Sequence, residues 1–370
     1  MKEELKIRFL SDLIDFKNGK SIKPSSGNIP IYGGNGILGY SEKYNYKNIL
    51  IIGRVGAYCG SIHYHKEKCW VSDNAIAGEV KSDYSIDYLY YLMKSLNLND
   101  RQVGSSQPLL TQGVLNNISV KIYESSQTQQ SIAAVLSALD KKIALNKQIN
   151  ARLEQMAKTL YDYWFVQFDF PDANGKPYKS SGGEMVFDET LKREIPKGWK
   201  SFKLSELVTL STGKEDANFA TEQGIYPFFT CSEKILKCDV YSFDTQAILL
   251  AGNGTFSVKR FTGRFNAYQR TYVLEPKSKN LYPIVYFVII DNVVKFTSGS
   301  RGSIIKFITR GDIENIDVVL PNDIENMRFS EVLYTYLLQA ELLEKQNYQL
   351  TQLRDFLLPM LMNGQVSVAE

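Results

Sequence analysis

Apolar residues recur at a heptad spacing through a long stretch in the middle of the chain, residues 127–165. The stretch contains no Pro and no Gly, and it is rich in Ala, Leu, Lys, Gln, Glu and Met, which favour helix. Its two expected seams hold Ile132, Leu139, Asn146, Leu153 and Leu160, and Val135, Ile149, Met156 and Tyr163. The pattern predicts one long helix, and Asn146 would fix its register if it pairs. A long helix buried in an ordinary core is the alternative.

A second helix of the same kind is predicted near the C-terminus, at residues 325–362. Its expected seams hold Leu343, Leu350 and Leu357, and Ala340 and Asn347. Pro359 and Gly364 are expected to end it. Two heptad helices in one chain most economically pair with each other, so we expect an antiparallel coiled coil.

The regions in front of the two helices read as two copies of one pattern. Residues 10–20 and 204–214 share a phrase that predicts a short helix or turn, a strand and then Gly-Lys. Each copy continues with Gly-ended apolar runs typical of buried strands, a short apolar helix, a Gly/Ser loop and a closing strand.

The later elements of the two copies are expected at matching places. In the first copy they are strands at 48–54, 70–77 and 115–120 and a helix at 86–96. In the second copy they are strands at 247–253, 267–274 and 313–319 and a helix at 282–293. Residues 166–199, rich in Pro, Gly, Ser and charge, are expected to be a connector.

Composition excludes few functions, but positive and negative charges are unevenly distributed along the chain. The chain has 370 residues, 44% hydrophobic and 22% charged, with a net charge of +3. The positive excess lies before residue 127 and between 201 and 310, whereas the C-terminal helix is acidic, so a polyanion is expected to meet the first two regions. No apolar run is long enough to span a membrane, and four scattered cysteines suit a cytoplasmic protein.

No catalytic set stands out. The chain lacks an Asn/Asp-Pro-Pro-aromatic methyltransferase motif and a Walker loop, and it has only two histidines. One group places four residues of zinc-ligand types within eleven positions, namely Cys59, His63, His65 and Cys69. Because no C-x2-C knuckle is present, we expect no metal and no cofactor. The two histidines are then either half-exposed strand residues or residues on a DNA-facing strand.

The order of phrases resembles the specificity (S) subunits of type I restriction–modification systems. The matching phrases are IPKGW at 195–199, QPLL at 107–110 running on to Val120, the helix start at 127–143, and LRDFLLPMLMNG at 353–364. The resemblance covers the whole chain. It implies an α+β fold with two similar β-rich target-recognition domains, separated by two long helices that form an antiparallel coiled coil.

The same resemblance implies the domain boundaries and the partners. The expected parts are target-recognition domain 1 at 1–126, a spacer helix at 127–165, a connector at 166–199, domain 2 at 200–322, and the second helix with its tail at 323–370. Each domain would read one half of a bipartite site in double-stranded DNA. The helices would set the number of base pairs between the two half-sites and would dock the modification (methyltransferase) subunits. A restriction (motor and nuclease) subunit would join through the complex. The chain itself would be non-catalytic and would contact no membrane.

Candidates for DNA contact are basic, amide and hydroxyl side chains on Gly-rich loops. In the first domain they are Lys17, Lys20, Lys23, Tyr32, Asn35, Arg54, Ser105, Ser106 and Gln107. In the second they are Lys214, Asn253, Lys259, Arg260, Arg264, Arg270, Ser300, Arg301 and Lys306. Arg301 leads because glycines and serines flank it, and Arg260 and Arg264 follow. The second half lacks a close counterpart of the YGGNG run at 32–36, so the two domains are expected to read different bases.

Three alternatives stay open. A coiled-coil scaffold without sequence-specific DNA binding predicts no salt-dependent DNA affinity. A single-chain enzyme predicts methylation or cleavage by the isolated protein. The aromatic end of the first helix, residues 161–165, is either a partner surface or part of the core where the helix meets its domain.

Overall fold

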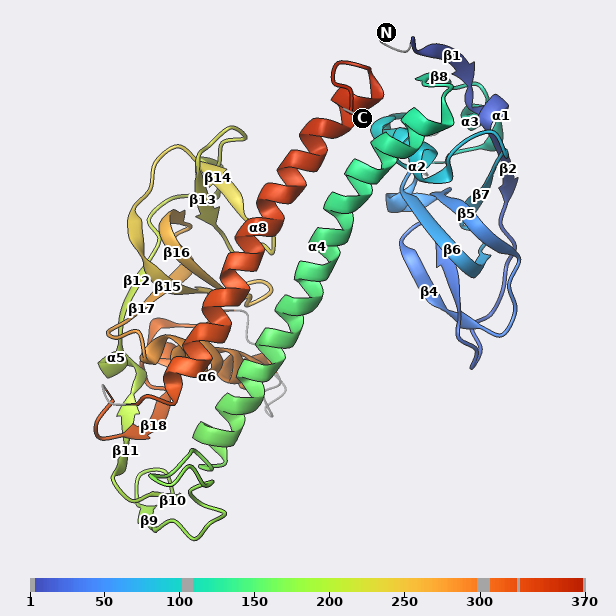
Figure 1. Ribbon diagram of the computed structural model, residues 1–370. Helices are drawn as coiled ribbons and strands as arrows, with labels where there is room; N and C mark the ends of the chain where they lie inside the picture. Colours follow the sequence, from blue (N-terminus) through green and yellow to red (C-terminus); the bar gives the residue numbers. More distant parts are fainter. Residues whose placement is uncertain (1–3, 102–108, 298–306, 325–326, 369–370) are drawn as a thin grey trace. The chain divides into compact units, whose positions relative to one another are not determined.

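A computed structural model describes residues 4–101, 109–297, 307–324 and 327–368. The chain divides into two compact units, residues 1–145 with 347–370, and residues 146–346. Each unit contains one β domain and one segment of each long helix. Figure 1 shows the elements along the chain.

A six-stranded sheet forms the centre of the first β domain, in the order β2-β7-β5-β6-β3-β4. Neighbouring strands are antiparallel except β3 and β6, which are parallel. The strands are β2 (Ile14–Asn18), β3 (Ile29–Gly33), β4 (Gly36–Ser41), β5 (Tyr46–Gly53), β6 (Ile62–Val71) and β7 (Ala75–Val80). The other elements are β1 (Lys6–Phe9), β8 (Ser119–Ile122), α1 (Leu10–Leu13), α2 (Ile86–Ser95), α3 (Gln112–Asn116), and the turns η1 (Gly56–Tyr58) and η2 (Leu98–Arg101).

The core of the first unit lies between the sheet, α2 and the two long helices. Leu50 and Ile52 of β5 are fully buried there with Leu89 of α2. The same cluster takes in Leu136 and Leu361 from the long helices. Burial of these side chains, at about 25 cal/mol per Å² of apolar surface, is what holds the helix segments to the domain.

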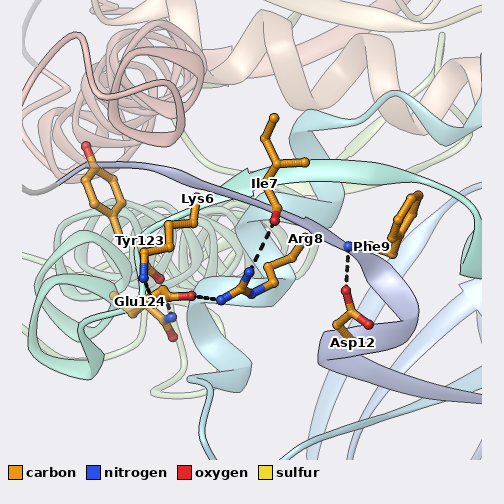
Figure 2. A network of polar contacts seen from close by, with 8 residues as sticks. Lys6, Ile7, Arg8, Phe9, Asp12, Tyr123 and Glu124 are labelled. Atoms are coloured by element: carbon orange, nitrogen blue, oxygen red, sulfur yellow. Dashed lines mark hydrogen bonds and ion pairs between the residues drawn. The ribbon is translucent and has the colours of Figure 1, made fainter.

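Strands β1 and β8, from the two ends of the first domain, form a separate antiparallel ribbon. Lys6 and Arg8 both pair with Glu124, which follows β8, and the Lys6 Nζ to Glu124 Oε2 distance is 2.6 Å (Figure 2). The Asp12 carboxylate accepts a hydrogen bond from the Phe9 N–H at 2.9 Å and so caps α1 (Figure 2). The ion pairs therefore hold β1 to the end of β8, and the Asp12 cap fixes the turn from β1 into α1.

The second β domain repeats this topology strand for strand. Its sheet has the order β12-β17-β15-β16-β13-β14, and β13 and β16 are its parallel pair. The strands are β12 (Val208–Thr212), β13 (Tyr226–Phe229), β14 (Leu236–Cys238), β15 (Phe243–Ala251), β16 (Val258–Ala267) and β17 (Thr271–Pro276). The ribbon is β11 (Trp199–Lys203) with β18 (Asp317–Pro321), and the helices are α5 (Leu204–Leu207), α6 (Leu281–Thr297) and α7 (Arg310–Glu314), with the turn η4 (Ala217–Phe219).

The shared topology confirms the internal repeat, with local corrections. The strands expected at 70–77 and 267–274 are wrong, because each range is the end of one strand, a turn and the start of the next. The closing strands expected at 115–120 and 313–319 begin later than expected, since Thr111 and Thr309 cap the short helices α3 and α7 first. The connector contains a hairpin that the sequence reading missed, β9 (Met185–Asp188) with β10 (Arg193–Pro196).

The long helices are α4 (Ser126–Tyr161), followed by the π-helical turn η3 (Asp162–Val166), and α8 (Ser330–Met362). In the first unit Asp140 binds Arg354, and the Ile143 carbonyl accepts a bond from Asn347. In the second unit Asn146 binds Gln346 and Asn150 binds Glu344. Partner numbers fall along α8 as they rise along α4, so the helix segments pair antiparallel in each unit, as expected.

Burial identifies the seams. On α4 the seam through Ile132 and Asn146 is correct, since both are buried. The second seam is off by one residue: Leu136, Ile143 and Ala157 are buried, whereas Ile149, Met156 and Tyr163 are exposed. On α8 all five expected seam residues are buried or half-buried. Pro359 lies inside α8 rather than ending it.

The aromatic end of α4 belongs to the core of the second unit. Trp164 and Phe165 are buried and contact Phe329 at ring-centroid distances of 5.7 and 5.6 Å. Trp199, which opens the second domain, stacks on Phe170 at 4.7 Å in the same cluster. This confirms the core interpretation of the segment. None of the helices that the structure describes is both long enough and apolar enough to cross a membrane.

Candidate nucleic-acid interface

Several loops of the first domain gather around the ends of β3 and β5, and we call them loop end 1. The group comprises residues 19–20, 32–36, 53–60, 72–74 and 109–110. Backbone hydrogen bonds join them: Arg54 N–H to Asn74 O at 3.0 Å, Ser72 N–H to Tyr32 O at 2.9 Å, and Leu110 N–H to Arg54 O at 2.9 Å. The loops therefore form one surface, although they are far apart in sequence.

Glycine makes this close approach possible. A Cβ at Gly53 would lie 2.0 Å from the Tyr58 carbonyl oxygen, and one at Gly19 would lie 1.9 Å from the Ser72 oxygen. Gly213 in the second domain is equally confined, with a Cβ position 1.9 Å from the Ala267 oxygen. The repeated Gly-Lys phrase thus has a packing reason, because the glycine lies against backbone and leaves the following lysine exposed.

Four expected DNA contacts lie on loop end 1. Lys20 and Asn35 are exposed, and Asn35 occupies the tight turn between β3 and β4. Arg54 follows β5, half-buried, with Nη1 3.5 Å from the Asp73 carbonyl oxygen. Tyr32 is half-buried, its hydroxyl 3.2 Å from His65 Nδ1, and burial raises its pKa.

Two other candidates of the first domain lie elsewhere. Lys17, on β2, pairs with Glu79 at 2.6 Å, and that hydrogen bond raises the pKa of the lysine. Lys23 is exposed beside the edge strand β4, where the N–H of nearby Ser25 donates to the Tyr40 carbonyl. Ser105, Ser106 and Gln107 fall outside the described residues.

The second domain gathers the equivalent loops, residues 213–215, 229–232, 252–257, 268–270 and 307–308, as loop end 2. Gly252 N–H donates to Arg270 O at 2.8 Å, and Ile308 N–H donates to Gly252 O at 2.8 Å. The Thr255 hydroxyl donates to the Cys231 carbonyl at 3.3 Å. Lys214 and Arg270 are exposed on this surface, and Asn253 is half-buried.

Lys259, the second residue of β16, donates to the carbonyl of Ser232 in loop end 2. Burial lowers the pKa of Lys259. Ser300, Arg301 and Lys306 are outside the part of the chain that the structure describes, so the leading candidate of the sequence reading has no described place.

Arg260 does not fit the DNA contact expected of it. Only 3% of its side chain is exposed, and its guanidinium pairs with Glu154 of α4 at 2.6 Å and Glu344 of α8 at 3.3 Å. Residue 260 alternates with Lys259 along β16 and so faces the long helices. Arg264 is exposed on the same strand, but it pairs with Asp244 at 3.1 Å and lies over the Tyr241 ring, apart from loop end 2.

The four residues considered as zinc ligands have other contacts. A nitrogen of His63 lies 3.0 Å from the Gly34 carbonyl oxygen, and His65 binds Tyr32. The Cys59 thiol donates to the Arg54 carbonyl at 3.3 Å. Cys69 is buried, and burial raises its pKa to about 12. No three His, Cys, Asp or Glu side chains converge as metal ligands within the described ranges. The two histidines instead contact Gly34 and Tyr32 of loop end 1.

The sequence reading missed an exposed aromatic ring at each loop end. Tyr58, in η1, is 51% exposed on loop end 1, and Phe307 is 63% exposed on loop end 2, where it bridges to Asn253. The signal for Tyr58 was available, since a lone aromatic between Gly56 and Gly60 has few neighbours to cover it. Such rings suit contact with bases or thymine methyl groups.

Comparison with known proteins gives the family. The model of the type I restriction modification DNA specificity domain matches residues 2–155 and 196–352. The EcoDI type I restriction enzyme specificity subunit of Escherichia coli is 45% identical over 181 residues, which are 47% of this chain and 40% of that subunit. The MjaIX specificity subunit of Methanocaldococcus jannaschii is 26% identical over 319 residues, 77% of this chain and 70% of that subunit.

A solved structure shares the fold. The S subunit of a type I restriction–modification system from M. genitalium superposes with a TM-score of 0.64 at 16% identity, over 97% of this chain and 96% of that one. The match to the EcoDI subunit thus spans less than half of that relative, whereas the fold match spans nearly all of both chains. With two matched domains covering most of its length, the chain belongs to the family of type I restriction modification DNA specificity domains.

Proposed function

We propose that this chain is the non-catalytic specificity subunit of a type I restriction–modification complex, and that each β domain reads one half of a bipartite DNA target. The observation that carries the proposal is the duplicated loop end. Two domains of one topology gather the same five loops but present different side chains on them. One fold used twice with different surface residues is suited to reading two different short sequences.

The side chains at the loop ends suit both parts of DNA recognition. Exposed Lys20 and Lys214 are suited to phosphate, which supplies salt-dependent affinity without sequence information. Asn35 and Arg54 in loop end 1, and Asn253 and Arg270 in loop end 2, are suited to base edges. Asn pairs best with adenine and Arg with guanine, each worth about 1–3 kcal/mol of discrimination.

The other subunits would supply the chemistry. The named relatives are specificity subunits of type I restriction enzymes. On this basis the paired helices dock modification subunits, which methylate the target, and a restriction subunit joins the same complex. The helices also set the gap between the half-sites. The chain would need no cofactor of its own.

A binding titration tests the proposal. The chain, assembled with its modification subunits, is titrated with duplexes of varied sequence at several salt concentrations. We expect strong preference for one split sequence and a log–log salt slope of several charges. Equal affinity for every duplex would refute sequence-specific DNA recognition. Absence of salt-dependent binding would favour a protein-binding scaffold. Methylation by the isolated chain with S-adenosylmethionine would instead indicate an enzyme.

A further inference from the structure

One buried arginine of the second β domain contacts both long helices. Arg260 projects from β16 with 3% of its side chain exposed, and its Nη2 lies 2.6 Å from Glu154 Oε1 and 3.3 Å from Glu344 Oε1. Glu154 belongs to α4 and Glu344 to α8. The Tyr286 ring of α6 lies 4.9 Å from the guanidinium. A single side chain thus joins three separate elements.

Hydrogen bonds next to Arg260 reinforce the same junction. Glu341 of α8 is almost fully buried and accepts bonds from the Thr262 N–H at 3.0 Å and the Thr262 hydroxyl at 3.1 Å. Lys345 pairs with Glu341 at 3.0 Å and donates to the Thr262 carbonyl at 3.2 Å. Alternate residues of β16 therefore bind α8, which fixes the strand at one position along the helix.

The first unit has a junction of the same kind, built from other residues. The buried Tyr91 of α2 donates its hydroxyl to Asp140 of α4 at 2.8 Å, and Asp140 pairs with Arg354 of α8 at 2.8 Å. The domain, the first helix and the second helix meet again through polar side chains. Apolar attraction has no preferred direction, whereas a buried charge must meet its partners, so these contacts add selectivity for one register.

We propose that Arg260 is a positioning residue, which fixes the place of the second β domain on the helix pair and thereby the number of base pairs between the two half-sites. The inference rests on the proposed function. It assigns Arg260 no contact with DNA. A buried polar group that selects one register among several is the best-attested role of such groups. Loss of the guanidinium would leave recognition of the bases intact, but it would allow more than one number of base pairs between the half-sites.

The test is a methylation map of cellular DNA with the full chain and its modification subunit. Arg260→Met keeps the length of the side chain and removes the charge, and half-exposed Glu154 and Glu344 can then turn to water. Wild type is expected to give one split motif with one gap. R260M is expected to give the same two half-sites, with methylation at gaps one base pair longer or shorter rising several-fold above the wild-type level.

Arg264→Met is the matched control, since it removes an exposed arginine of the same strand whose partner is Asp244 rather than a helix. It should keep the single gap. A single wild-type gap in R260M would overturn the proposal. Loss of the second half-site, with the protein still folded and assembled, would also overturn it, because Arg260 would then act in reading.

A second variant covers the case in which R260M does not accumulate. Glu154→Gln with Glu344→Gln keeps Arg260 in place and removes the ion pairs, and the same relaxed gap is expected. One unchanged gap in this double variant would contradict the proposal. Absence of any split motif in wild type would instead refute the proposed function, so the two failures can be told apart.

Discussion

Two asparagines, one at each loop end, stand on a firmly placed backbone. Asn35 stands in a turn between two paired strands, and Asn253 follows a strand and bridges to Phe307. Both amides are attached to hydrogen-bonded loops, so ordering them on DNA would cost little conformational entropy. These two asparagines are the best matched pair for testing the readers separately.

Asn35→Ala is expected to relax discrimination at one base pair of the first half-site only, by about 1–3 kcal/mol, because one bidentate amide contact is lost. Asn253→Ala should do the same in the second half-site only. Each variant is the control for the other. Competition binding with singly substituted duplexes measures both, and a loss spread evenly over all sequences would mean that the amides contact only the backbone.

The four thiols differ in access. Cys59, Cys69 and Cys238 are buried, and burial raises the pKa of each, whereas Cys231 is half-exposed on loop end 2. A thiol-specific reagent at pH 8 is therefore expected to modify one cysteine promptly in the folded protein. Cys231→Ser should abolish that fast phase. Prompt reaction of two or more thiols in the native protein would contradict the described cores.

At the scale of elements, the β1–β8 ribbon depends on charge. Glu124 accepts hydrogen bonds from Lys6 and Arg8, and these contacts hold its pKa below the usual carboxyl range (Figure 2). A carboxyl with a lowered folded-state pKa stabilises the fold above its unfolded pKa of about 4.3, and this contribution is lost as pH falls through the folded pKa.

Amide hydrogen exchange of β1 measures this effect. Protection of the Lys6–Phe9 amides is expected to decrease below about pH 4, after correction for intrinsic exchange rates. Glu124→Gln should show the weaker protection already at neutral pH and little further change on acidification. Equal protection in both proteins across the range would show that the ion pairs do not hold the strand.

Elements with local signals were predicted well. The heptads gave both long helices and three of four seams, and the duplicated Gly-Lys phrase gave matching starts for the two domains. The second α4 seam was missed because apolar Ile149 and Met156 outweighed Ala157 and Asn150, although the latter two face the partners. The merged strands at 70–77 and 267–274 are a different case, since polar residues do interrupt both runs, at Ser72 to Asn74 and at Gln269 and Arg270. Ser, Asp and Asn favour turns, so this signal was available and was overlooked.

The candidate site shows where sequence reasoning stops. Glycine-rich loops and the basic residues beside them were found, and Lys20, Asn35, Lys214 and Arg270 are exposed there. Arg260 was wrongly expected to contact DNA. Side chains alternate between the two faces of a strand, but the sequence alone does not say which face meets the helices, because that depends on how the strand pairs. Its partners, Glu154 and Glu344, read in the sequence as ordinary charged positions of long helices.

At the scale of the whole molecule, duplication is the central feature. Each unit contains one β domain that shares an apolar core with both long helices, and polar contacts join the three parts, through Tyr91, Asp140 and Arg354 in one unit and through Arg260 in the other. The loop ends differ, and so do the polar junctions. On the proposals above, base reading and positioning fall to different residues of the same domain, so the base preference of a domain could change without loosening its attachment.

The most direct measurement is a methylation map of a domain exchange. The chain is expressed with its modification subunit, and residues 1–126 are replaced by the same region of a relative with another specificity. We expect a split motif for the wild type. For the exchange we expect a motif that changes in one half, while the other half and the gap between the halves stay the same. A motif that changes in both halves, or a contiguous motif, would contradict it.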